Sequence, residues 1–325
     1  MLTLAAQAQT YTFTATTGAY EYLTDSISLN NGLTWDDPQF TIPIGFDFQF
    51  FDTTVNQIFI SENGGGGLLT FDDTDTGIHP ILVAYAEDLM DRAADTINYE
   101  DEPGALSPIS YKLVGDPGHR ILKIEWKNAG FFDDIYEDNV STDYVNFQLW
   151  LYEGTNDIEI HFGPNAITQP DLDYWTGKGP AIALVPHFDF DNGDIVGSAL
   201  LLSGVPYAPE LNQVSSDFET YSLDGTIPDG TIYKFSFHPD GVSELAAGAA
   251  IVSVFPNPAG DVIYILHRQS ASAIHKIIIR DLNGRAVKTI NQPSGRVDIS
   301  ALPPGPYVVF AHTASGVIAK KLIKE

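Results

Sequence analysis

Apolar and polar residues alternate strictly along residues 40–50 of this chain. Every even position from Phe40 to Phe50 is apolar, and the odd positions hold Thr, Pro, Gly, Asp and Gln. A period of two with one polar face is typical of an antiparallel strand that packs against a core. Because Pro43 has no amide hydrogen to donate, the pattern also predicts an edge strand or a bend at that position.

The segment 144–152 repeats this alternation with its apolar residues at odd positions. Other short apolar runs are bounded by clusters of Asp, Gly, Pro and Asn, which favour turns. These runs predict further strands at 55–61, 68–71, 81–86, 96–100, 109–114, 120–127, 157–162, 181–186, 199–203 and 231–237. Only 84–93 fits a helical turn or two. About a dozen short strands with turn-rich connections predict an all-β fold, with a large, jelly-roll-like β-sandwich at 10–238.

Charge divides the chain into two unequal parts. Residues 1–242 contain 38 acidic and seven basic residues, whereas residues 243–325 contain five acidic and nine basic ones. A uniform domain would not show this break, so we predict a small-residue linker at 239–250 and a second domain at 251–325. The acidic surface of the first domain repels nucleic acid and anionic lipid, so no nucleic-acid partner is expected. This acidic surface favours solubility, or the binding of a cation or a neutral ligand.

Several features bear on the compartment. The chain has no cysteine, so neither disulfides nor thiolate metal sites contribute. It has no run of 18 apolar residues, so no transmembrane helix is predicted. Ala6-Gln7-Ala8 resembles the cleavage site of a secretory signal peptide, and residues 1–9 are interpreted as the remnant of one. The alternative is a short polar tail.

The region 251–325 is also rich in short apolar runs. Roughly seven predicted strands fit a small, Ig-like Greek-key β-sandwich. Asn283-Gly284 supplies the two residues of positive φ that a type I′ turn requires. The sequence therefore predicts a two-residue hairpin between 275–281 and 285–290.

Four motifs follow one another in this region: Pro256-Asn257-Pro258, DLNGR at 281–285, LPPGPYVVF at 302–310, and the final KKLIKE. In order and spacing they resemble the type A C-terminal sorting domain of the type IX secretion system of the Bacteroidetes. The residues that carry the resemblance are Pro256, Asn257, Pro258, Asp281, Asn283, Gly284, Arg285, Leu302, Gly305, Tyr307, Lys320 and Lys321.

This resemblance implies where the protein goes and with what it interacts. It implies passage through the periplasm, engagement of the outer-membrane translocon and cleavage by the C-terminal-domain peptidase. The protein would then be attached to a lipopolysaccharide-type anchor or released. The first domain is similar to extracellular nidogen-type β domains in the stretches IPIGFDFQFFDTTVNQIFISENGGGGLLTF, RILKIEWKNAGFF and VNFQLWLYEGTNDIEIHFG. These stretches imply a fold, and no activity follows from them.

The sequence offers few candidates for catalysis or metal binding. It contains neither G-x-S-x-G nor H-E-x-x-H, and its eight His are scattered. Its abundant carboxylates leave open a pair for glycoside hydrolysis. The loop Asp189-Phe-Asp191-Asn192-Gly193-Asp194 gathers the oxygen ligands that Ca²⁺ prefers, although it departs from the EF-hand pattern. Calcium is therefore the candidate cofactor, and a solvated turn is the alternative.

Exposed aromatic residues can form a binding platform for glycans. Trp150 and Tyr152 are expected to point outward from the strand at 144–152, unless a second sheet covers them, and Tyr174 and Trp175 lie in a loop flanked by Gly and Pro. Trp35 and Trp126 are candidates for the core. We expect an exported cell-surface or secreted protein whose first domain is a non-catalytic binding or adhesion module for a glycan or a surface protein. A purely structural spacer and a secreted hydrolase are the alternatives.

Overall fold

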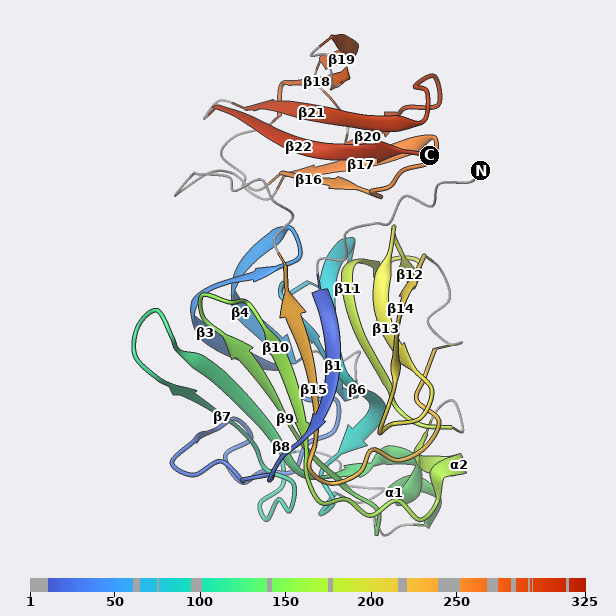
Figure 1. Ribbon diagram of the computed structural model, residues 1–325. Helices are drawn as coiled ribbons and strands as arrows, with labels where there is room; N and C mark the ends of the chain where they lie inside the picture. Colours follow the sequence, from blue (N-terminus) through green and yellow to red (C-terminus); the bar gives the residue numbers. More distant parts are fainter. Residues whose placement is uncertain are drawn as a thin grey trace.

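The computed structural model of the protein contains a large and a small all-β domain (Figure 1). It describes residues 11–60, 65–74, 76–94, 101–138, 142–174, 178–215, 221–238, 252–267, 274–281, 285–291, 293, 295–313 and 316–325. The predicted signal-peptide remnant 1–9 and the predicted linker 239–250 lie outside these residues. The helices are α1 (Phe132–Asp138) and α2 (Pro170–Asp173), and no helix in the described part is long and apolar enough to cross a membrane.

The large domain is a curled sheet whose two layers enclose the core. One layer has the order β1-β15-β10-β9-β8-β7-β2, and the other has the order β3-β4-β5-β6-β11-β13-β14, with β12 beside β11. Short antiparallel pairing between β6 and β8 joins the layers. The strands are β1 Tyr11–Thr17, β2 Ile27–Ser28, β3 Phe40–Phe50, β4 Thr53–Ile60, β5 Gly66–Thr70, β6 Ile78–Met90, β7 Ile109–Val114, β8 Ile121–Phe131, β9 Val145–Tyr152, β10 Ile158–Phe162, β11 Ala181–Asp189, β12 Asp194–Ile195, β13 Ala199–Ser203, β14 Glu210–Val214 and β15 Thr231–Phe237.

The alternation in β3 places its apolar side chains in the core, as predicted. Its even positions from Ile42 to Phe50 are buried, and most of its odd positions are exposed. Among the described strands β3 pairs only with β4, and the register between them shifts after Pro43. The prediction of an edge strand or a bend is therefore confirmed by the edge position, and the pairing is irregular beyond Pro43.

Large aromatic side chains fill the space between the layers. Phe147 of β9 stacks on Trp126 of β8, with ring centroids 4.6 Å apart, and on Tyr85 of β6 at 5.5 Å. Trp126 and Trp35 are both buried, as predicted. Burial of each such side chain stabilises the fold by about 1.5–3 kcal/mol, so this cluster anchors the two layers to each other.

The helical turn predicted at 84–93 is wrong for residues 84–90, which belong to strand β6. Here β6 pairs with β5 on one side and with β11 on the other, and Ile81, Leu82, Val83 and Ala84 are all buried. A central strand that is buried on both faces has a continuous apolar sequence rather than an alternating one. Pairing on both edges decides the conformation of this segment.

The small domain packs two sheets around its own core. One sheet has the order β16-β17-β20, and the other has the order β19-β18-β21-β22. The strands are β16 Val252–Phe255, β17 Val262–His267, β18 Lys276–Asp281, β19 Ala286–Asn291, β20 Arg296–Asp298, β21 Gly305–Thr313 and β22 Gly316–Lys324. Ile263, Ile277, Ile279 and Val309 lie at the centre of this core. Both predicted β-sandwiches are thus confirmed.

The hairpin between β18 and β19 is confirmed, but its predicted two-residue turn is wrong. The Asp281 amide donates to the Arg285 carbonyl oxygen at 3.0 Å, so residues 282–284 lie between the closing pair. The register of the two strands shifts after Ile279, as in hairpins that combine a three-residue loop with a bulge. Asn283 and Gly284 themselves lie outside the described residues.

Candidate functional sites

The first and last motifs of the small domain lie side by side. The Asn257 carboxamide donates to the Lys321 carbonyl oxygen at 3.0 Å and accepts from the Ile323 amide at 2.7 Å. The Ala259 amide donates to the Ile323 carbonyl oxygen at 2.8 Å. The turn that contains Pro256 and Pro258 is therefore fastened to the end of β22.

The middle motifs also have structural contacts. The Asp281 carboxylate accepts from the backbone amide of Arg285 at 2.9 Å and from its Nε at 3.1 Å, which closes the hairpin. The Tyr307 hydroxyl donates to the Pro303 carbonyl oxygen at 2.7 Å. Leu302 packs in the core, and Gly305 has a φ of 149°, which favours glycine.

The basic residues of the last motif lie on β22. Lys320 is opposite Val309 of β21, and Lys321 is opposite Val308 and exposed. All of the motif residues that the structure describes therefore belong to one folded unit.

On the outer face of the large domain, a row of side chains crosses four strands at Trp150. Lys123 of β8, Trp150 of β9, Glu159 of β10 and Lys234 of β15 are register partners. The Lys123 ammonium lies 3.4 Å from the centroid of the Trp150 ring, and the His161 imidazole stacks on that ring at 3.9 Å. We call Lys123, Trp150, Tyr152, Glu159, His161 and Lys234 the Trp150 face.

Glu159 is the centre of the polar contacts on the Trp150 face. Glu159 accepts from the Tyr152 hydroxyl at 2.7 Å and from the Lys234 ammonium at 3.0 Å, and it lies 2.9 Å from His161 Nε2. Lys234 also contacts Asp157 at 3.0 Å. Burial raises the pKa of Glu159, but its hydrogen bonds outweigh burial and lower the pKa to about 2. The carboxylate is therefore ionised at neutral pH.

The segment 18–24 covers the part of this outer face next to Trp150. The Tyr20 hydroxyl donates to Glu125 at 3.1 Å, and Gln148 Nε2 donates to Glu125 at 2.6 Å and to the Glu21 carbonyl oxygen at 2.8 Å. Glu125 and Gln148 are buried there, and burial raises the pKa of Glu125. Trp150 and Tyr152 themselves stay partly exposed.

The other predicted aromatic pair does not supply a platform at Tyr174. Its side chain is only 1% exposed, and its hydroxyl donates to Thr226 Oγ1 at 3.1 Å. Its ring contacts Phe131 edge to face with centroids 6.5 Å apart. The prediction of an exposed ring is therefore wrong for Tyr174, and Trp175 lies outside the described residues.

The loop predicted to bind calcium joins β11 to β12. Its Asp189 carboxylate accepts from the amides of Asp191 and Asn192, at 3.0 and 3.2 Å, and from Asn192 Nδ2 at 2.8 Å. Gly193 has a φ of 72° and donates its amide to the Asp189 carbonyl oxygen at 2.7 Å. These contacts shape a tight turn, with Asp191 and Asp194 exposed. Calcium binding at this loop stays a prediction.

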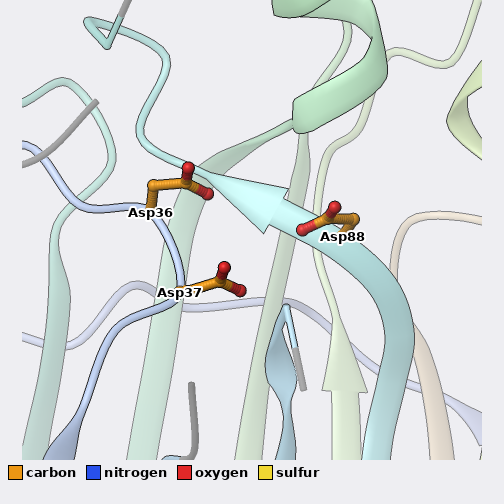
Figure 2. Close-up of side chains that lie close together, drawn as sticks. All are labelled: Asp36, Asp37 and Asp88. Carbon is orange, nitrogen blue, oxygen red and sulfur yellow. The ribbon is translucent and has the colours of Figure 1, made fainter. Parts of the chain in front are cut away.

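A second group of carboxylates gathers three aspartates from two distant segments. Asp36 and Asp37 precede β3, and Asp88 lies near the end of β6; in Figure 2 the three side chains are gathered beside the end of β6. One oxygen from each lies within 4.8 Å of the others. Burial, together with the charges of Asp37 and Asp133, raises the pKa of Asp88 to about 6. Asp88 is therefore half protonated near pH 6, which relieves repulsion within this group in mild acid.

Sequence reasoning missed these aspartates and the partners of Trp150. Lys123, Glu159 and His161 lie in strands that were predicted, and alternation alone assigns each a face within its own strand. Which strands neighbour each other requires the pairing, which the sequence does not show. Asp36 and Asp88 carry no motif, and only the fold brings them together.

Comparisons with known proteins confirm both resemblances. Residues 10–236 match the family described as NIDO related, and residues 253–325 match the family described as secretion system C-terminal sorting domain. A search of the curated proteins found no match. Among solved structures, the chain is similar to PorZ, an essential bacterial surface component of the type IX secretion system of Porphyromonas gingivalis.

The likeness to PorZ is distant. Sequence identity is 13%, the match covers 79% of this chain and 43% of that chain, and the TM-score is 0.18. No argument is drawn from a likeness at this level. The family matches and the four motifs together support one conclusion. The chain belongs to the NIDO-related family and carries a C-terminal sorting domain of the type IX secretion system, which marks it as a protein exported to the cell surface or the medium.

Proposed function

We propose that the NIDO-related domain is a non-catalytic binding module that holds a neutral glycan at the Trp150 face outside the cell. The observation that carries the proposal is the row of Lys123, Trp150, Glu159 and Lys234 across four neighbouring strands. Strands of a packed sheet hold such side chains more rigidly than loops do, and rigid aromatic and polar groups favour binding.

The charges of the Trp150 face favour a neutral ligand over an ionic one. Glu159 and Lys234 neutralise each other, and Lys123 is positioned over the indole ring. Counting Asp157, which also contacts Lys234, two lysines stand against two carboxylates here, so the face presents hydrogen-bond donors and acceptors with little net charge to be matched. Sugar hydroxyls use both kinds of group, and the partly exposed aromatic rings add apolar contact. An acidic domain of this kind also disfavours nucleic acid.

The spacer alternative is supported by a different observation at the same place. Lys123 and His161 reach the Trp150 ring from strands on opposite sides of β9. In this alternative the ring serves packing within the sheet, and the domain holds no ligand.

The hydrolase alternative requires two carboxyl groups about 5–10 Å apart in a cleft. Asp88, with its raised pKa, is the strongest candidate for the acid, but its partners Asp36 and Asp37 lie within 4.8 Å of it. This limit between nearest oxygens lies close to the separation of about 5–5.5 Å in a retaining pair, but three carboxylates share the place instead of two. Its test is loss of hydrolysis of a polysaccharide on the substitution Asp88→Asn.

A glycan array with the folded chain tests the binding proposal. We expect neutral glycans to bind the wild type and to bind Trp150→Ala at least about tenfold more weakly, because truncation of a central aromatic residue typically costs more than 1.4 kcal/mol. Tyr207→Ala is the matched control, since Tyr207 is 75% exposed and lies between β13 and β14. Thermal melts of both variants establish that they are folded. Absence of binding by the wild type across a broad array supports the spacer instead.

A further inference from the structure

Three aspartates lie buried together around α1 and α2, which lie at the end of the large domain away from the small one (Figure 1). Asp134 belongs to α1, Asp143 precedes β9, and Asp173 ends α2. Their exposed fractions are 0%, 0% and 4%. Charged carboxylates are rarely buried to this degree without a compensating partner, so the hydrogen bonds of each one decide its protonation state.

Asp134 and Asp143 each accept several hydrogen bonds from the segments packed around them. Asp134 accepts from Gln169 Nε2 at 2.8 Å and from the Thr142 amide at 3.1 Å. Asp143 accepts from the Thr168 amide, from Thr168 Oγ1 at 2.8 Å and from the Gln169 amide at 3.0 Å. Burial raises the pKa of Asp143, but these bonds together with its contact to Asp173 lower it overall.

Asp173 has a different environment. Neither of its carboxyl oxygens accepts a hydrogen bond of good geometry from a donor in the described residues. The Gln169 amide lies near Asp173 and lowers its pKa. Its hydrogen bond, however, goes to the Asp143 carboxylate at 3.0 Å. The Asp173 carboxyl is in hydrogen-bonding contact with the Asp143 carboxylate. Two carboxylates in contact repel each other unless a proton lies between them.

We propose that Asp173 carries a proton in the folded domain and donates it to Asp143, forming an acid-dependent latch that fastens α2 to residues 142–144 and 168–169. The latch is independent of the proposed glycan binding. It joins two segments that are 30 positions apart in sequence at the end of the sandwich. With the proton absent, the two charges repel, and α2 loses its contact with Asp143.

The surroundings of Asp173 favour its protonated form. Burial is the largest cause of its raised pKa of about 8, followed by the contact with Asp143 and the charges of Asp143 and Asp134. Tyr85 of β6 and Tyr174, which follows α2, are buried beside Asp173; burial and the nearby Glu87 of β6 raise the pKa values of both tyrosines, which stay neutral. The cation of Arg92 lies 4.9 Å from the centroid of Tyr144, next to Asp143.

The pH dependence has a definite sign. The ordinary pKa of 3.8 applies to Asp173 in the unfolded chain, and the pKa of about 8 applies in the folded one. Between these values folding takes up one proton, so stability falls as pH rises from about 4 to about 8. The contribution of the latch is complete below pH 4 and lost above pH 8. Within this window it changes the folding constant by up to about tenfold per pH unit.

Denaturant unfolding of the full chain at successive pH values tests the latch. In Asp173→Asn the side-chain amide can still donate to Asp143 but does not titrate, so the variant should lack the extra tenfold change per pH unit between pH 5 and pH 7. Asp171→Asn is the matched control, because Asp171 is exposed on the same helix and should keep the wild-type slope. Equal slopes in wild type and Asp173→Asn overturn the proposal.

A second measurement does not depend on a variant that folds. Carbon-13 NMR of the wild type labelled at aspartate should show one carboxyl group that titrates near pH 8, and backbone amides of 168–174 should lose protection above that pH. If every aspartate is ionised at pH 7, the proposal is wrong.

Discussion

Asn257 offers the sharpest test of what the sorting motifs do within the fold. Its carboxamide accepts the Ile323 amide at 2.7 Å and donates to the Lys321 carbonyl oxygen at 3.0 Å, and so joins the Pro-Asn-Pro turn to β22. Asn257→Ala removes both bonds. Each bond contributes about 0.5–1.5 kcal/mol net, and both lie near the surface where water replaces them in part. We therefore expect a loss of about 1–2 kcal/mol from the small domain.

Thermal unfolding of the full chain measures this loss. Hydrogen exchange of the β22 amides shows that the loss belongs to the small domain. For a domain of this size, 1 kcal/mol corresponds to about 4–8 °C, so the small domain should melt about 5–15 °C lower. Asn257→Asp keeps the acceptor for Ile323 but loses the donor, and should fall between Ala and wild type. Asn291→Ala, at an exposed position of β19, is the control and should melt like wild type.

The same variants separate stability from recognition. If Asn257→Ala melts like the wild type, the structural account of this motif is refuted. If it is also retained in the periplasm, the secretion machinery contacts Asn257 directly. If stability and secretion fall together, the motif acts by holding the sorting domain in its folded form.

Two further predictions concern the large domain. Gly67→Ala should lower its stability by about 3 kcal/mol or more in denaturant unfolding, because the new Cβ would lie 1.7 Å from the Tyr85 carbonyl oxygen. Gly260→Ala of the small domain, whose new Cβ meets no atom within 4 Å, is the control and should leave the large domain unchanged; a wild-type midpoint for Gly67→Ala would contradict the β5–β6 geometry. If a calcium site exists, millimolar calcium should raise the melting temperature of the chain. Asp88→Asn should abolish this rise if the three aspartates bind the ion, and Asp189→Asn should abolish it if the loop after β11 binds it. Identical melts in calcium and chelator would remove calcium from the account.

Short-range patterns in the sequence predicted the elements with one clear face. The alternation in β3 fixed which side chains enter the core, and Pro43 marked the bend. The short apolar runs of the small domain predicted its β-sandwich, and its four motifs predicted its family. These features depend on neighbours in the sequence, so they can be read without knowledge of the pairing.

The features that the sequence did not predict depend on distant contacts. The segment 84–90 was expected to contain a helical turn, but it forms a strand because β6 pairs with neighbours on both of its edges. The contact between Asp143 and Asp173 requires α2 to fold back onto the start of β9, and neither residue stands in a recognisable motif. Tyr174 resembled a loop residue, but packing against Phe131 buries its ring.

Localisation of a truncated chain tests the central claim most directly. Cells that produce the full chain and cells that produce a chain lacking residues 251–325 are fractionated, and the NIDO-related domain is detected with an antibody. Because the sorting domain matches 253–325, the full chain should reach the surface or the medium and the truncated chain should accumulate in the periplasm. Equal surface delivery of both chains would contradict the account.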